Sequence, residues 1–148
     1  MENLPRNLFI ASIVLFLISL VLPACGNSGG DGGLGLALLL FGPLGLLAGE
    51  AIALSWLANP LLFAAWITFK KNVRISFLLS VFAFLASAYF LGFDEMITGS
   101  NGLGTMREAI EYRFGYWFWL ASTAAMMVGT GIQIIDEMKQ KKKTKNAE

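Results

Sequence analysis

The strongest constraint on the fold is a series of long apolar segments that carry almost no charge. The first is Leu8–Leu22, and it reaches about 20 residues, the length needed to cross a hydrocarbon core of about 30 Å, if the helix extends from Pro5 to Ala24. The apolar runs predict four spans, at residues 5–24, 48–69, 75–91 and 114–135. Only 14% of the residues are charged, too few to cover a water-exposed surface of this size. We therefore expect an all-α transmembrane four-helix bundle in which residues 1–138 form one domain.

The second span is the ambiguous one, because Leu34–Phe69 contains 36 residues and a single charge, Glu50. One helix of that length would measure about 54 Å, far more than a bilayer needs. Lys70, Lys71 and Arg74 follow directly, and basic residues favour the cytoplasmic side. A single crossing at about Ala48–Phe69 places them there. Leu34–Leu47, broken by Gly42-Pro43 and Gly45, is then predicted to be a short interfacial or re-entrant segment on the outer side.

The distribution of basic residues orients this layout in the membrane. Nine of the eleven lysine and arginine residues fall on one predicted side: Arg6, the 70–74 cluster and the basic tail at residues 139–148. Both termini are therefore expected in the cytoplasm, and the protein in the cell inner (plasma) membrane. The predicted environment is the lipid bilayer. Nucleic acid is not expected as a partner, because the net charge is only +1.

Residue types exclude several chemistries. The chain has no histidine and one cysteine, Cys25, so a Cys/His zinc site and a histidine general base cannot be built. We expect no catalytic residue, no cofactor and no bound metal. One enzymatic alternative stays open: Asp94, Glu95, Glu108 and Glu111 in the predicted outer loop could converge on a cation or act on lipid.

Glu50 and Asn59-Pro60 are the candidate polar positions. Glu50 precedes Lys70 by twenty residues, about 30 Å of helix, which predicts a solvated carboxylate at the outer interface. The alternative is a proton or cation site, because an intramembrane carboxylate is a functional candidate. Asn59-Pro60 falls near the middle of the second span, where proline predicts a kink. That position is a candidate hinge or cavity-lining polar site.

Small residues recur at four-residue spacing in two segments, which would place each set on one helix face. The predicted packing residues are Gly45, Gly49 and Ala53 in the second segment and Ala121, Ala125 and Gly129 in the fourth span. They favour helix packing within the bundle, or contact with a second copy or another membrane protein.

Three further patterns lie near the outer end. Tyr112, Tyr116, Trp117 and Trp119 are typical of an interfacial aromatic belt. The segment from Thr105 to Glu108 fits a capping box, which predicts a helix that begins there and runs into the fourth span. Leu22-Pro23-Ala24-Cys25 is similar to a lipoprotein processing site, so cleavage and lipidation at Cys25 stay open.

Two short motifs carry a resemblance: Trp56-Leu57-Ala58-Asn59-Pro60, and Gly115-Tyr116-Trp117-Phe118-Trp119-Leu120-Ala121-Ser122. Together they resemble small bacterial four-span inner-membrane proteins, a group that brings no activity with it. The sequence thus predicts a non-enzymatic accessory or interaction protein of the cell envelope. The alternative is an oligomeric small transporter or channel that uses Glu50 and Asn59.

Overall fold

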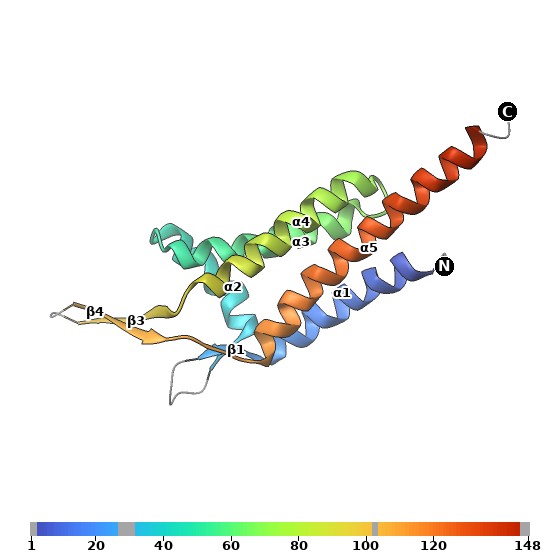
Figure 1. Ribbon diagram of the computed structural model, residues 1–148. Helices are drawn as coiled ribbons and strands as arrows, with labels where there is room; N and C mark the ends of the chain where they lie inside the picture. The colour runs from blue at the N-terminus through green and yellow to red at the C-terminus, as the bar shows by residue number, and fades with distance from the viewer. Residues whose placement is uncertain (1–2, 27–31, 102–103, 146–148) are drawn as a thin grey trace.

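The computed structural model describes residues 3–26, 32–101 and 104–145, which form an elongated helical bundle (Figure 1). The α-helices are α1 (Leu4–Val21), α2 (Gly35–Leu47), α3 (Ala58–Thr68), α4 (Val73–Tyr89) and α5 (Phe114–Lys145). Two 3-10 helices, η1 (Ala51–Leu57) and η2 (Phe90–Gly92), join them. In this part of the chain, four helical segments are long and apolar enough to cross a membrane: Leu4–Val21, Ala51–Thr68, Val73–Gly92 and Phe114–Thr144. The prediction of four apolar spans is confirmed.

The spans pack as two neighbouring pairs. Helix α1 runs along α5, and α3 and α4 form a hairpin whose turn is capped by Asn72 (Figure 1). The Asn72 side chain accepts hydrogen bonds from the backbone nitrogens of Arg74 and Ile75, both at 3.2 Å, which satisfies two donors that every helix start leaves unpaired.

The bundle core combines apolar side chains with paired hydroxyl groups. Phe16, Leu62 and Met126 are among its buried residues. Helices α4 and α5 are joined by hydrogen bonds between Ser80 and Thr130 (3.1 Å) and between Ser87 and Thr123 (3.0 Å). Many large apolar side chains point outward on every span, as they do in proteins whose solvent is lipid.

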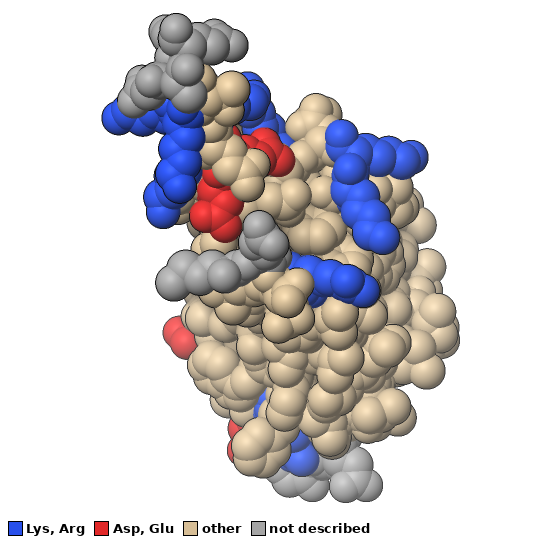
Figure 2. All heavy atoms as spheres, turned by 90° about the vertical axis from the view of Figure 1, so that its right-hand side faces the viewer, with Lys and Arg blue, Asp and Glu red and all other residues tan. Residues whose placement is uncertain are grey.

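The two ends of the bundle differ in character. The N-terminus, the α3–α4 turn and the C-terminal half of α5 lie at one end (Figure 1). Pro5, Phe69 and Gln133 line a common hollow there. Lysine and arginine side chains gather there (Figure 2), and we call it the basic end. The opposite end carries the strands and α2, and we call it the sheet end. The basic residues on three separate segments are thus brought together by the fold.

The second span differs from the predicted continuous helix at 48–69. Helix α2 ends at Leu47, and Gly49 takes a left-handed backbone conformation (φ +77°), which reverses the chain before η1. Gly45, Gly49 and Ala53 therefore do not share one helix face, and that prediction is wrong. Gly45 instead lies against Ala53 across the turn, because glycine lets the two segments approach closely. Pro60 lies near the middle of the candidate span Ala51–Thr68, as predicted, and falls in the first turn of α3 directly after η1, where its missing donor costs little.

The connections at the sheet end form strands, so the fold is not purely all-α. Strand β1 (Pro23–Gly26) pairs with β2 (Gly33–Leu34) and β5 (Glu111–Tyr112), and β3 (Glu95–Asn101) forms a hairpin with β4 (Gly104–Ala109). The predicted capping box is wrong, because its residues lie in β4 and pair with β3. The backbone N–H and C=O groups that a helix would have paired internally are paired instead between β3 and β4.

The fourth span begins where the sequence predicted and extends further. Helix α5 starts at Phe114 and continues to Lys145, well past residue 135. The charged residues of the tail are good helix formers, so they prolong the helix rather than fray from it. Residues 146–148 of the basic tail lie outside the described residues.

Candidate binding pocket

A cavity of about 380 Å³ lies among the helices at the sheet end of the bundle. This size falls within the range of small-molecule sites, about 300–1,000 Å³. Helices α1, α2, α3 and α5 and the η1 and η2 turns all contribute to it. The lining is mostly apolar and includes Phe16, Leu20, Leu38, Leu39, Phe41, Ile52, Phe90 and Trp119. Its polar members are Ser19, Cys25, Glu50, Ser55, Asn59 and Tyr116.

Asn59 is the central polar group of the cavity. Its side chain is only 6% exposed, and its Oδ1 accepts a hydrogen bond of 2.9 Å from Nε1 of Trp119. An indole nitrogen can only donate, so the atom that faces it must be the amide oxygen. The Asn59 amide nitrogen is therefore turned away from Trp119. It has no hydrogen-bond partner among the described residues.

Trp56 fixes the α2 wall of the cavity. Its Nε1 donates to the carbonyl oxygen of Leu39 at 2.8 Å. In a regular helix that carbonyl would accept from residue 43, but Pro43 has no N–H. The indole thus replaces a hydrogen bond that proline removes. Gly42 makes this possible, because a Cβ there would overlap the Trp56 ring.

The hydroxyl groups of the lining already use their protons. Ser19 donates to the carbonyl oxygen of Phe16 (2.6 Å), and Ser55 donates to that of Ile52 (2.7 Å). Tyr116 donates to the carbonyl oxygen of Ser87 at 3.1 Å. A single hydroxyl proton serves one bond at a time, so these side chains offer the cavity acceptors rather than donors.

Cys25 lies in β1, where its backbone pairs with Tyr112 of β5. The thiol is free and 4% exposed, and burial raises its pKa above the ordinary value of 9.0. Such a thiol is protonated and unreactive at neutral pH. Helix α1, which processing at Cys25 would remove, packs along α5 and supplies Phe16 to the core.

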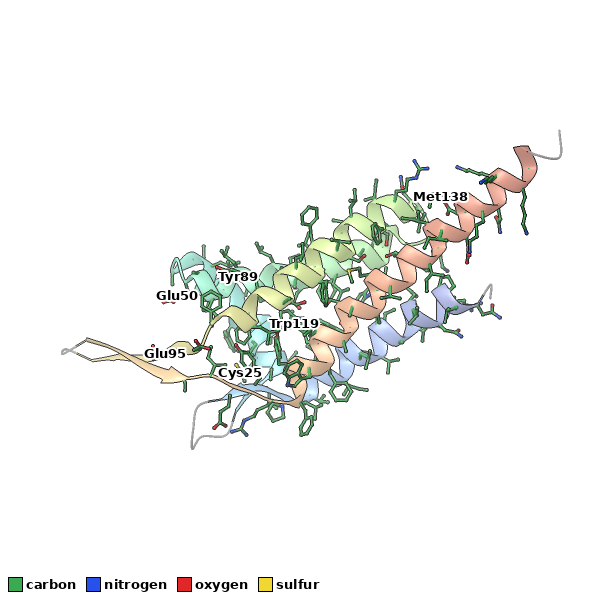
Figure 3. The ribbon with its side chains drawn as sticks, in the orientation of Figure 1. Cys25, Glu50, Tyr89, Glu95, Trp119 and Met138 are labelled. Carbon is green, nitrogen blue, oxygen red and sulfur yellow. The ribbon has the colours of Figure 1, made fainter. Side chains whose placement is uncertain are left out.

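Glu50 and Asn59 line the same cavity, as their candidate roles require, but at different depths. Glu50 precedes η1 and is half-buried, and Figure 3 shows it at the outer edge of the turn between α2 and η1. Trp119, the partner of Asn59, lies inside the bundle in the same view. The carboxylate therefore belongs to the rim and the amide to the interior.

The acidic residues of the predicted outer loop form no metal centre in the part of the chain that is described. Asp94, Glu95 and Glu111 are described with their side chains, and the side chain of Glu108 lies outside the described residues. Among described side chains, no group of three or more His, Cys, Asp or Glu residues could hold a metal ion.

The aromatic belt prediction is wrong for two of its four residues. Tyr116 is 2% exposed and Trp119 bonds to Asn59, so both face the interior, whereas Trp117 faces outward. The Tyr112 hydroxyl donates to the carbonyl oxygen of Phe93 at 2.7 Å. The i, i+3 spacing of Tyr116 and Trp119, with Trp117 on another face, is the signal that could have separated them.

The small residues of α5 contribute to packing at one position. Gly129 is buried against α1, and a Cβ there would lie 3.0 Å from Cβ of Leu8. Ala125 is half-buried and Ala121 is exposed. Of the three predicted packing residues of α5, Gly129 thus lies in the α1–α5 contact and Ala121 lies on the outer surface.

Comparison of the chain with protein-family models, with curated proteins and with solved structures gave no match.

Proposed function

We propose that the chain is a non-enzymatic accessory protein of a bacterial inner membrane that acts by associating with another membrane protein. The observation that carries this proposal is helix α2. Its 13 residues are apolar, glycine or proline, and in the described structure each of them is at least partly exposed. A helix that is hydrophobic all round normally has its surface covered.

The geometry of α2 supports a helix of the partner as its cover. At about 20 Å it is too short to cross a bilayer, so crossing the membrane does not explain its composition. Leu40, Leu44 and Leu47 follow the i, i+4, i+7 spacing of one face, and with Phe41 they are 60–84% exposed. This is the pattern by which a helix packs along another helix.

The test uses the single native cysteine. In a Cys25→Ser background, Leu40→Cys in native membranes is treated with a bifunctional maleimide. An adduct heavier than the monomer that contains a second, different polypeptide supports the proposal. An adduct of two copies identifies homo-oligomerisation instead. Leu78→Cys, on an equally apolar and exposed face of α4, is the matched control. Equal adducts from both positions, or none from Leu40, contradict the proposal.

The orientation that we propose places the basic end in the cytoplasm and the sheet end outside. It is supported by the start of α1, the α3–α4 turn and the C-terminal half of α5 lying at the same end (Figure 1), where lysine and arginine side chains gather (Figure 2), as the positive-inside rule requires. Lys71→Cys and Lys142→Cys should both resist an impermeant maleimide on intact cells, whereas Asp94→Cys should react. Opposite accessibility of positions 71 and 142 would overturn the four-span layout.

A second candidate function is an oligomeric small transporter or channel. It is favoured by one observation, that Glu50 and Asn59 line a common cavity. Purified protein in liposomes should then move an ion or a small solute, and both Glu50→Gln and Asn59→Leu should abolish the flux. Flux that persists in both variants, or no flux in the native protein, excludes this function.

A further inference from the structure

The cavity at the sheet end contains a donor pair that the fold orients but does not use. Asn59 is more than nine-tenths buried, and its Oδ1 is held by Trp119. The two N–H groups of its amide have no partner among the described residues. Buried polar groups in proteins are hydrogen-bonded in the great majority of cases. The Asn59 amide nitrogen is not among the fully enclosed side-chain atoms that lack a partner, so it is accessible in the cavity and free to donate to a bound acceptor.

The neighbouring polar groups narrow the chemistry of that acceptor. The hydroxyl groups of Ser19 and Ser55 already donate to backbone carbonyls of their own helices. The Asn59 amide is therefore the side-chain donor that a ligand in the cavity would meet. Among the described residues, the lining includes no lysine or arginine, and its rim carries Glu50. A negatively charged headgroup would lack a counter-ion there and would be repelled by that carboxylate. The acceptor must be uncharged.

The apolar part of the lining indicates that most of the ligand is hydrophobic. Leu20, Leu38, Leu39 and Phe90 come from α1, α2 and η2 and surround the cavity with hydrocarbon. Small-molecule sites share this plan, in which an apolar wall provides affinity and a few polar groups fix orientation. We propose that the cavity binds an uncharged hydrophobic molecule whose carbonyl oxygen accepts a hydrogen bond from the Asn59 amide. This site goes beyond the proposed accessory function, because its polar group is Asn59 of α3 and it needs no protein partner, although α2 supplies part of its wall.

The test compares three probes that share one photoreactive acyl chain. The probes are a neutral glycerol ester, the free fatty acid and the plain hydrocarbon, each added to the full-length protein in nanodiscs. After illumination, adducts on peptides that contain Asn59 or Trp119 are counted by mass spectrometry. The ester should label these peptides roughly five-fold more than either other probe, the preference that one hydrogen bond provides.

Two variants separate binding from folding. Asn59→Leu should lower ester labelling to the hydrocarbon level, because it removes the donors while keeping an apolar side chain of similar size. Leu38→Trp should lower labelling by all three probes, because it narrows the cavity without touching the Asn59–Trp119 pair. Ser122→Ala is the matched control, since Ser122 is buried in α5 but does not line the cavity, and its labelling should equal that of the native chain.

Competition distinguishes the source of the ligand. Protection by a neutral acyl lipid built into the nanodisc identifies the bilayer as the source. Protection only by a short-chain methyl ester added from water identifies a free molecule, and both results support the site. Equal labelling by ester and hydrocarbon, or labelling that is unchanged in both Asn59→Leu and Leu38→Trp, overturns it. Those results leave the α2 cross-linking experiment untouched, so the two proposals fail separately.

Discussion

Nε1 of Trp56 donates to the Leu39 carbonyl at 2.8 Å, the carbonyl that Pro43 leaves without a donor inside α2. A proline inside a helix removes the donor for the carbonyl four residues earlier, and that carbonyl must then find another donor. Here the replacement comes from η1, which folds back along α2 after the turn at Gly49. The same contact joins the two segments and closes one wall of the cavity.

Trp56→Phe should lower the free energy of unfolding by about 1–3 kcal/mol, because it leaves the Leu39 carbonyl without a partner. In a Pro43→Ala background the loss should be smaller by about 1 kcal/mol, since the introduced alanine supplies the missing backbone donor. Denaturant unfolding in detergent of the native chain, both single variants and the double variant completes the cycle. Purely additive losses would show that the indole acts only through packing.

Gly42→Ala tests how closely α2 and η1 approach each other. A Cβ at this position would overlap the Trp56 ring, so the variant should lose about 1–3 kcal/mol despite the better helix propensity of alanine. Gly92→Ala is the matched control: among the described residues, no heavy atom beyond its chain neighbours and its own helix lies within 4 Å of its Cβ position, so its stability should be nearly unchanged. Thermal unfolding of both variants provides the comparison. Similar melting temperatures would contradict the close α2–η1 contact.

The hydrogen bond between Ser87 and Thr123 allows the strength of the α4–α5 contact to be measured. Their oxygens lie 3.0 Å apart and are both buried. A double-mutant cycle with Ser87→Ala and Thr123→Val should give a coupling free energy of about 0.6 kcal/mol, the typical value for such pairs in membrane proteins. A coupling free energy near zero would mean that each hydroxyl serves only the carbonyl of its own helix.

The burial of Cys25 predicts that the stability of the protein depends on pH in the alkaline range. Burial raises the pKa of its thiol above 9.0, so the folded state favours the protonated form more than the unfolded state does. That contribution to stability is complete below pH 9 and is lost as the pH rises through the folded pKa. The native chain should therefore lose more stability than Cys25→Ala between pH 9 and pH 11. Parallel stability profiles would contradict a buried thiol.

The same thiol provides a direct measure of burial. At pH 8, iodoacetamide should alkylate Cys25 at least about ten-fold more slowly in the folded chain than in the chemically unfolded chain, because the thiolate is the reactive species. Mass spectrometry of the whole protein follows the reaction without ambiguity, since the chain has no other cysteine. Equal rates in the two states would place the thiol outside the packed β1 strand.

Features that depend only on residues close together in the sequence were predicted correctly. Four apolar segments become four candidate spans, and the fourth of them begins at Phe114, where the apolar run predicted it. The interfacial interpretation of Tyr116 and Trp119 failed because burial of an aromatic ring depends on which helix faces it. The capping box at Thr105 failed because a short local motif competes with strand pairing, and β3 supplied that pairing. Asn59 was identified as a candidate polar residue, but not its partner.

The sequence alone determined that four segments are long and apolar enough to cross a membrane, because length and composition can be read from residues that are neighbours in the chain. The tertiary structure decided where the chain turns and which side chains line the cavity. Trp56 lies 17 residues from Leu39, and Trp119 lies 60 residues from Asn59. Such contacts follow from helix packing, which brings together side chains that no local pattern links.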